Sequence, residues 1–113
     1  MKVYGIKNCD TVKKTLTWLN DNNFEYDFHD FKKSGISEEK LEEWAEKLGW
    51  ENLINKRGAT WRKLEPEVQN SIITKNAAFA LMKEKTSVIK RPVTETEGKI
   101  VIGFDVAGLE SLR

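Results

Sequence analysis

In the first thirty residues, the spacing of apolar residues is first typical of a strand, then of a helix, and then again of a strand. The run Lys2–Ile6 leans apolar and predicts a short strand. From Asp10 apolar residues recur at helical spacing, which predicts a helix that ends in the polar run 21–23. Residues 24–29 then alternate, which predicts a half-buried strand. Its apolar side holds Phe24, Tyr26 and Phe28, and its polar side holds Glu25, Asp27 and His29, so we expect His29 to be exposed.

The middle of the chain has helical periodicity. Lys32–Gly35 carries a turn signal, and Ser37 is placed to cap a helix whose apolar residues follow at i, i+3, i+4 and i+7. Gly49 stands where the glycine that ends such a helix is expected. A segment over residues 50–57 leads to a turn at Gly58. Two further helices are predicted over residues 66–73 and 76–85.

The last part of the chain is strand-like again. Val88–Ile89 is β-prone and precedes the pair Arg91–Pro92. Ile100–Phe104 is a strongly β-prone run after a turn at Glu97–Gly98. Asp105 is then placed to cap a short terminal helix that runs through residue 112.

This order of elements predicts an α/β fold. The opening strand, helix and strand imply a parallel pair with a right-handed crossover, and the close spacing of the last two strands implies an antiparallel hairpin. Together they predict a thioredoxin-like four-stranded mixed sheet with flanking helices. We expect one domain over residues 1–113, with the sheet core at about 1–34 and 86–113 and a helical insertion at about 35–85.

Composition narrows the class of protein. The 19 basic and 18 acidic residues leave a net charge of +1, so the chain lacks the basic face that direct nucleic-acid binding requires. No apolar run approaches the length of a membrane span, and no signal peptide is evident, so we expect a soluble, cytoplasmic protein without a membrane partner. One histidine, one cysteine and no acidic cluster at ligand spacing predict no metal site.

Trp61 is followed by Arg62 and Lys63, a combination of aromatic and cationic side chains that also occurs where bases stack. The balanced charge favours the other interpretation, in which Trp61 packs within the helical insertion.

Cys9 is the only cysteine, and it falls at the joint between the first predicted strand and helix. Helix N-termini carry about half a positive charge and unpaired N–H groups, which stabilise a thiolate. Thr11 could donate a hydrogen bond to the sulfur, and nearby lysines add positive charge, while Asp10 opposes it. The alternative is a small buried hydrophobe, which is what free cysteines usually are. The polar neighbours Asn8 and Asp10 favour an exposed joint.

Three stretches form a pattern that covers essentially the whole chain: YGIKNCDTVKK near the start, NKRGATWRKL in the middle, and IKRPV followed by IVIGF near the end. In this order and spacing they resemble the ArsC/Spx family of thioredoxin-like proteins, and most closely its YffB branch. The resemblance implies a thioredoxin-like fold and thiol chemistry of the kind that arsenate reductases perform.

The resemblance also implies roles for particular residues. Cys9 matches the nucleophile of arsenate reductases that use glutathione and glutaredoxin to resolve the adduct. Arg57 and Arg91 match two arginines that hold an oxyanion and stabilise the thiolate, and guanidinium groups fit such anions well. Pro92 matches a cis-proline that faces the thiol. The residues expected to bind substrate are Asn8, Thr11, Arg91 and Pro92.

Two departures from the family pattern shape the prediction. Phe104 stands where the arsenate reductases carry a third arginine, and Cys9–Val12 contains no second cysteine of a C-x-x-C switch. We therefore predict a glutathione-dependent thiol reductase with no bound cofactor, glutathione as co-substrate, glutaredoxin as a further partner, and an external thiol that resolves the adduct. One alternative is an Spx-like regulator that binds RNA polymerase without catalysis. The other is an arsenate reductase with an incomplete set of arginines.

Overall fold

The computed structural model describes residues 1–113, which form two compact units. The first unit comprises Met1–Ser34 and Arg91–Arg113, and the second comprises Gly35–Lys90. The second unit extends to residue 90, whereas the sequence predicts that the insertion ends at about 85. It extends further because residues 89 and 90 pair with the segment around Leu53. Ile89 forms an isolated antiparallel bridge with Ile54, and the Lys90 N–H donates to the Leu53 carbonyl at 2.8 Å.

The first unit holds a four-stranded sheet in the order β2-β1-β3-β4. The strands are β1 (Lys2–Gly5), β2 (Asp27–Asp30), β3 (Val93–Thr96) and β4 (Lys99–Ile102). Strand β1 is parallel to β2 and antiparallel to β3, and β3 is antiparallel to β4. The predicted mixed sheet, with its parallel crossover and its final hairpin, is confirmed.

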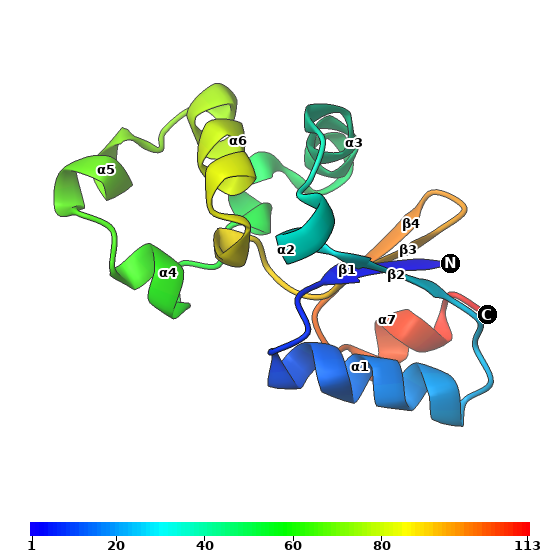
Figure 1. The fold of residues 1–113 in the computed structure, drawn as a ribbon. Helices are drawn as coiled ribbons and strands as arrows, with labels where there is room; N and C mark the ends of the chain where they lie inside the picture. The colour runs from blue at the N-terminus through cyan, green and yellow to red at the C-terminus, as the bar shows by residue number, and fades with distance from the viewer. The chain divides into compact units, whose positions relative to one another are not determined.

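Two helices cover one face of this sheet, α1 (Asp10–Asp21) and α7 (Val106–Glu110), as Figure 1 shows. Between them and the sheet lies an apolar core, whose buried members are Val3, Leu19, Val101, Leu109 and Leu112. Trp18, Phe24, Tyr26 and Phe28 pack against this core from its margin. The shared side predicted for residues 24, 26 and 28 is therefore confirmed.

The predicted strands differ from the observed ones at their ends, most of all at the second and the third strand. β1 ends at Gly5 and not at Ile6, and β4 covers Lys99–Ile102 and not Ile100–Phe104, so Phe104 lies beyond it. The second strand begins at Asp27 and not at Phe24, because its partner β1 begins at Lys2, which pairs with Asp27. The third strand begins after Pro92, whereas Val88 closes a short 3₁₀ helix, η2 (Thr86–Val88). Proline has no N–H to donate within a sheet, and Pro92 accordingly lies directly before β3 and not within it.

His29 is not exposed as the alternation predicts. Its ring is half-buried and lies 4.9 Å from the Tyr4 ring and 5.9 Å from the Phe31 ring, measured between centroids. Phe31 reaches this position because Phe31–Ser34 forms one helical turn, α2, before Gly35 at φ +62°. The turn predicted at 32–35 is therefore partly helical. The Tyr4 hydroxyl donates to Glu95 Oε1 at 2.9 Å on the same face of the sheet.

The second unit is helical. Its elements are α3 (Glu38–Leu48), η1 (Trp50–Leu53), α4 (Ala59–Arg62), α5 (Pro66–Ser71), α6 (Lys75–Glu84) and η2. The predicted ends of α3 are confirmed, since Ser37 Oγ accepts from the Lys40 N–H at 3.1 Å and Gly49 follows the helix at φ +86°. Trp61 is 8% exposed, which confirms that it packs within its unit. Lys56 Nζ lies 5.3 Å from the centre of its indole.

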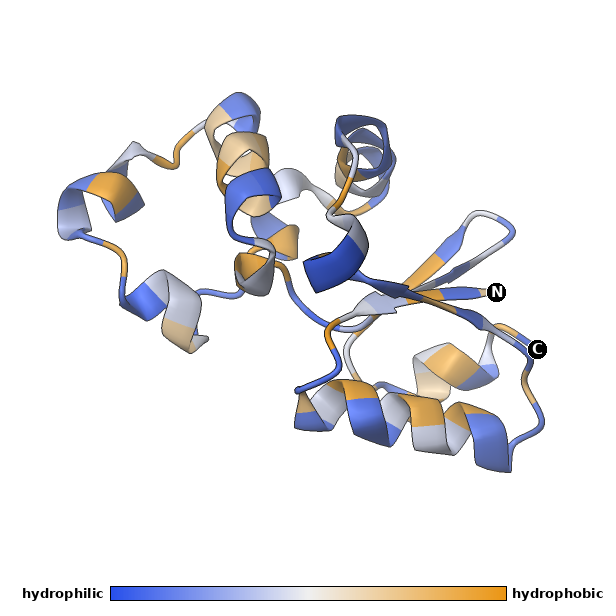
Figure 2. Cartoon of the chain, viewed as in Figure 1, coloured by the Kyte–Doolittle hydropathy of each residue, from blue (hydrophilic) through white to orange (hydrophobic).

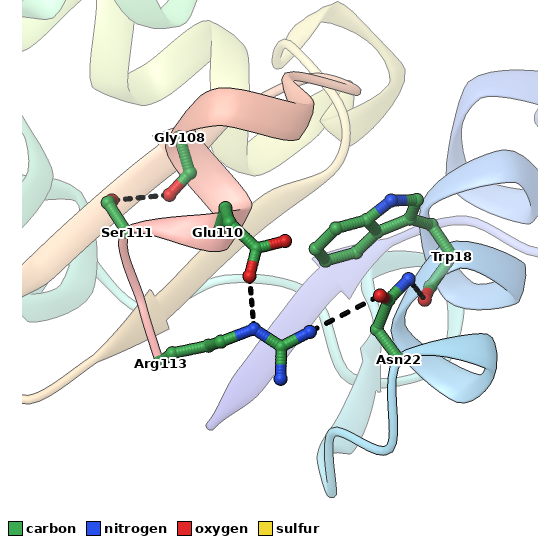
Figure 3. Close-up of polar contacts among 6 residues, drawn as sticks. All are labelled: Trp18, Asn22, Gly108, Glu110, Ser111 and Arg113. Carbon is green, nitrogen blue, oxygen red and sulfur yellow. Dashed lines mark hydrogen bonds and ion pairs between the residues drawn. The ribbon is translucent and has the colours of Figure 1, made fainter.

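The C-terminal residues make polar contacts with the end of α1. Asp105 caps α7 as predicted, because its Oδ1 accepts from the Gly108 N–H at 3.1 Å. Arg113 then pairs with Glu110 and donates from Nη2 to Asn22 Oδ1 at 3.2 Å, a link between α7 and the end of α1 that Figure 3 shows. Its guanidinium carbon lies 4.9 Å from the centre of the Phe24 ring. The terminal helix is thus held over the core by polar contacts as well as by its leucines.

Apolar and polar residues alternate along α1 in Figure 2, as expected for a helix with one buried side. No helix of the structure has the length and apolar character that crossing a membrane would require.

Candidate active site

Cys9 is the N-cap residue of α1. Its backbone is extended, with φ −138° and ψ 119°, and its carbonyl accepts the first helical hydrogen bond, from the Lys13 N–H at 3.0 Å. The thiol makes no capping hydrogen bond, and the residue is half-buried. The first N–H groups of a helix have no partners within it, so the sulfur lies at the positive end of α1. The predicted position of the thiol is confirmed.

Gly5 determines how closely the first turn of α1 approaches the sheet. A Cβ at this position would lie 2.9 Å from Val12 Cγ2 and 3.7 Å from Phe28 Cε1. Val12 is fully buried and cannot give way easily. The absent side chain of Gly5 therefore lets the first turn of α1, which directly follows Cys9, pack closely against β1.

Polar and charged groups surround the thiol. Asn8 and Asp10 are exposed, and Thr11 is half-buried. The Thr11 carbonyl accepts from the Thr15 hydroxyl at 2.9 Å, a contact within α1. Lys13 and Lys14, in the next turn, are exposed and take part in none of the ion pairs of the chain. The surroundings of Cys9 are therefore polar and carry charge of both signs, from Asp10 next to the thiol and from the two lysines one turn further along α1.

Arg91 and Pro92 stand at the same end of the sheet as Cys9. Tyr4 pairs with Val93 in the antiparallel ladder, so the residues before Val93 lie beside the carboxyl end of β1, from which the chain passes to Cys9. The Arg91–Pro92 peptide bond is cis, as predicted. The Pro92 carbonyl accepts from the Gly103 N–H at 2.8 Å, which joins this loop to the end of β4. Pro92 is buried and Arg91 is half-buried.

Arg57 belongs to the second unit, in the segment between η1 and α4. Its side chain is exposed, and its backbone N–H donates to Asn55 Oδ1 at 3.1 Å. Its assignment to the site of Cys9 stays a prediction. The first unit by itself brings Asn8, Cys9 and Thr11 to the end of the sheet that also carries Arg91 and Pro92.

The sequence analysis missed a groove along α1, which is lined by Lys13, Lys14, Thr17, Trp18, Asp21 and Phe104. The helical spacing of the α1 residues could have indicated a common face. No local signal brings Phe104 to that face, because it depends on the hydrogen bond between Gly103 and Pro92. The whole chain contains no cluster of three or more histidine, cysteine or acidic side chains that could hold a metal ion.

Comparison with solved structures gives two close matches. A structure named YFFB protein has a TM-score of 0.91 and 40% identity, with 97% of this chain and 96% of that chain covered. The structure of an arsenate reductase (ArsC) related protein from Brucella melitensis has a TM-score of 0.76 and 43% identity, with 97% and 91% covered. These likenesses confirm the thioredoxin-like fold.

Comparison with curated proteins extends the relationship. An uncharacterized protein of Haemophilus influenzae is 46% identical over 103 residues, which are 91% of this chain and 90% of that protein. The regulatory protein MgsR of Bacillus subtilis is 26% identical, with 96% and 86% covered. The global transcriptional regulator Spx of Lactiplantibacillus plantarum is 20% identical, with 91% and 78% covered. The sequence model of the ArsC family matches residues 4–112, and the chain therefore belongs to the ArsC family.

Proposed function

We propose that the protein is a glutathione-dependent thiol reductase in which Cys9 is the nucleophile. The observation that carries the proposal is the position of the only thiol, at the N-cap of α1 and at the end of the sheet that bears the cis-Pro92 loop. A reactive cysteine needs a thiolate, an accessible sulfur and a surface that positions the substrate. In the proposal the N-terminus of α1 stabilises the thiolate, the half-buried Cys9 is accessible to the substrate, and the loop before β3 positions the substrate.

The chemistry follows from the presence of one thiol. The Cys9 thiolate attacks the glutathione sulfur of a mixed disulfide, forms a bond to that sulfur and releases the substrate thiolate. The thiolate of a second glutathione then attacks the Cys9 adduct, which yields oxidised glutathione and restores the Cys9 thiolate. An external thiol is required because the chain has no second cysteine. Glutaredoxin would serve as a further reductant of such adducts.

In this proposal Arg91 binds an anionic group of the substrate, such as a glutathione carboxylate, and helps to hold the thiolate. Its planar, permanently charged fork suits a carboxylate. Arg57 takes the same role as a second ligand, a proposal that rests on its place in the NKRG motif. Asn8, Thr11 and Pro92 complete the surface on which glutathione lies.

The test compares two disulfides of different charge. Cys9 of the wild-type protein should form a mixed disulfide with oxidised glutathione, releasing one reduced glutathione, and with the uncharged hydroxyethyl disulfide, releasing one mercaptoethanol, and Cys9→Ser should form neither. Arg91→Ala should lose about tenfold or more in its preference for oxidised glutathione, the value of one charged hydrogen bond of roughly 1.5–3 kcal/mol. Arg91→Lys, which keeps the charge, should lose less. An Arg91→Ala protein that is folded and keeps the full preference would contradict this role of Arg91.

A second candidate is a regulatory role in which the protein binds RNA polymerase without catalysis. The similarity to the regulators Spx and MgsR favours it. The absence of a second cysteine argues against redox control by an internal disulfide. A pull-down with the polymerase α subunit separates the two functions. If binding and cellular function persist in Cys9→Ala, the enzyme proposal is wrong.

Arsenate reduction is the third candidate, and it is the weakest. Phe104 offers no charge where the arsenate reductases carry their third arginine, and one ligand of the oxyanion is missing. We expect little or no turnover in an assay with arsenate, glutathione and glutaredoxin. Turnover comparable to that of an arsenate reductase would overturn this ranking.

A further inference from the structure

The groove along α1 starts one turn beyond Cys9. The Lys13 N–H is bonded to the Cys9 carbonyl, so Lys13 lies on the side of the helix that carries the thiol. Thr17 and Asp21 follow at intervals of four residues and line the same groove. From Lys13 to Asp21 the helix rises about 12 Å, at 1.5 Å per residue. A stretch of roughly four extended residues has this length.

Two aromatic residues, Trp18 and Phe104, line the groove. Phe104 is 40% exposed, although it is a large apolar residue next to the candidate site. Trp18 is half-buried, and one side of its ring lies against Phe24 at 5.7 Å between centroids. The position of Phe104 follows from its neighbour Gly103, which is bonded to Pro92. The aromatic lining of the groove is therefore connected, through Gly103, to the loop that carries Pro92.

The lining of the groove is positively charged at the end near Cys9. Lys13 and Lys14 are exposed and form no ion pair with the acidic residues of the chain. At the far end the groove is bordered by Asp21. A small inorganic oxyanion would use the lysines but not the aromatic lining. A polypeptide segment with an acidic and an apolar side chain would use both.

We infer that the groove binds the polypeptide that carries the substrate thiol. The inference rests on the proposed function and defines its substrate class as a glutathionylated protein or peptide. Within about four residues of its cysteine, the substrate has an acidic side chain for Lys13 and Lys14 and a large apolar side chain for Phe104 and Trp18. The groove holds the polypeptide side of the mixed disulfide, while glutathione lies toward Arg91. Cys9 attacks the glutathione sulfur, and the peptide leaves as its thiolate.

The test uses two glutathionylated peptides. One has Glu and Phe within four residues of its cysteine, and in the other these are replaced by Ser and Gly. Wild-type protein should reduce the first with a kcat/KM about tenfold higher. Phe104→Ser should abolish this preference without changing the rate at which oxidised glutathione forms a mixed disulfide with Cys9. Val106→Ser is the matched control, because Val106 is 45% exposed and lies outside the groove.

The lysines are tested in the same way. The double substitution of Lys13 and Lys14 by Glu should lower the rate for the Glu-containing peptide more than the rate for the peptide with Ser and Gly. Lys32 and Lys33 of α2, substituted together by Glu, give a control with the same change in net charge outside the groove. If both double variants slow both peptides equally, the lysines act only through overall charge and the inference is wrong.

A binding experiment separates the inference from the proposed function. The first peptide, with its cysteine replaced by serine, should shift the NMR signals of Trp18 and Phe104 and compete with the glutathionylated peptide. Binding at these residues without any disulfide reduction would refute the reductase and support the groove. Reduction of both peptides at equal rates, with no shift at Trp18 or Phe104, would refute the groove and leave the reductase intact.

Discussion

The contact between Gly5 and Val12 gives a prediction that links the core to the site. Substitution of Gly5 by alanine adds one methyl group on β1, under the first turn of α1. That methyl would lie 2.9 Å from Val12 Cγ2 and 3.4 Å from Val12 Cγ1, whereas ordinary contacts are 3.4–4 Å. Either α1 must move outward by roughly half an ångström or Val12 must leave its preferred rotamer.

The magnitude of the effect follows from two opposing contributions. Overpacking a buried site destabilises a protein by about 1–3 kcal/mol. Gly5 has no positive φ, so alanine also restricts the unfolded chain and returns about 0.4–1 kcal/mol. The overpacking is larger, and we expect Gly5→Ala to lower the free energy of unfolding by about 1–2 kcal/mol. Urea unfolding, followed by tryptophan fluorescence, measures this loss.

A double-mutant cycle with Val12→Ala tests the cause. Val12→Ala alone leaves a cavity and should cost about 1–3 kcal/mol, but it also removes the two methyl groups that the methyl added by Gly5→Ala would meet. The double variant should therefore be more stable than the sum of the two losses predicts, by about 1 kcal/mol or more. Strict additivity, or a Gly5→Ala protein as stable as the wild type, would refute the proposed contact.

Three further predictions concern stability and use the same unfolding assay. Thr94 is fully buried between Val3 and Val101, and its hydroxyl has no hydrogen-bond partner, so Thr94→Val should stabilise the protein by about 1 kcal/mol. Thr15→Val is the matched control, because the equally buried Thr15 hydroxyl donates a hydrogen bond within α1, and its loss should destabilise the protein by about 1 kcal/mol. If both variants change the free energy of unfolding in the same direction, the argument is wrong. Asp105→Ala removes the cap of α7 and should cost about 1 kcal/mol, whereas Asp105→Asn should cost less. Arg113→Ala should cost less than about 1 kcal/mol, because its ion pair is half exposed, and a larger loss would mean that the stacking on Phe24 matters more than the charge.

Much of the sheet could be predicted because its signals are local. The apolar run at residues 2–6, the helix after Asp10 and the turn at Glu97–Gly98 each follow from residues close in sequence. Both turn residues have positive φ, 47° and 80°, as a tight two-residue hairpin requires. Caps at Ser37 and Asp105 were predictable for the same reason, since the capping side chain lies next to the N–H groups that it accepts from.

The structure differs from the prediction where contacts between residues far apart in the sequence determine it. The alternation places His29 on a polar face, but its ring packs against the rings of Tyr4 and Phe31. No local sequence pattern predicts these contacts. Val88 and Ile89 are β-prone, yet Ile89 pairs only with Ile54 in the second unit. The third strand begins beyond Pro92 because the ladder with β1 starts at Val93.

Some features of the candidate site could also be predicted from the sequence, and others could not. Cys9 and its place at a helix start were predictable from the order of elements, and the cis bond before Pro92 was predictable from the family pattern. The hydrogen bond from Gly103 to Pro92 and the exposed ring of Phe104 depend on the assembled sheet. Phe104 was recognised in the sequence only as a missing arginine, whereas the structure makes it part of a groove beside α1.

The central claim is that the fold makes Cys9 a reactive thiol, and that glutathione supplies the second thiol that resolves the adduct. Intact-mass spectrometry after mixing with oxidised glutathione tests it most directly, with the native protein compared with the same protein unfolded in urea. We predict that the native protein gains one glutathione, faster than the unfolded protein does, and loses it again when reduced glutathione is added. An adduct that forms only after unfolding, or one that reduced glutathione does not remove, would contradict the account.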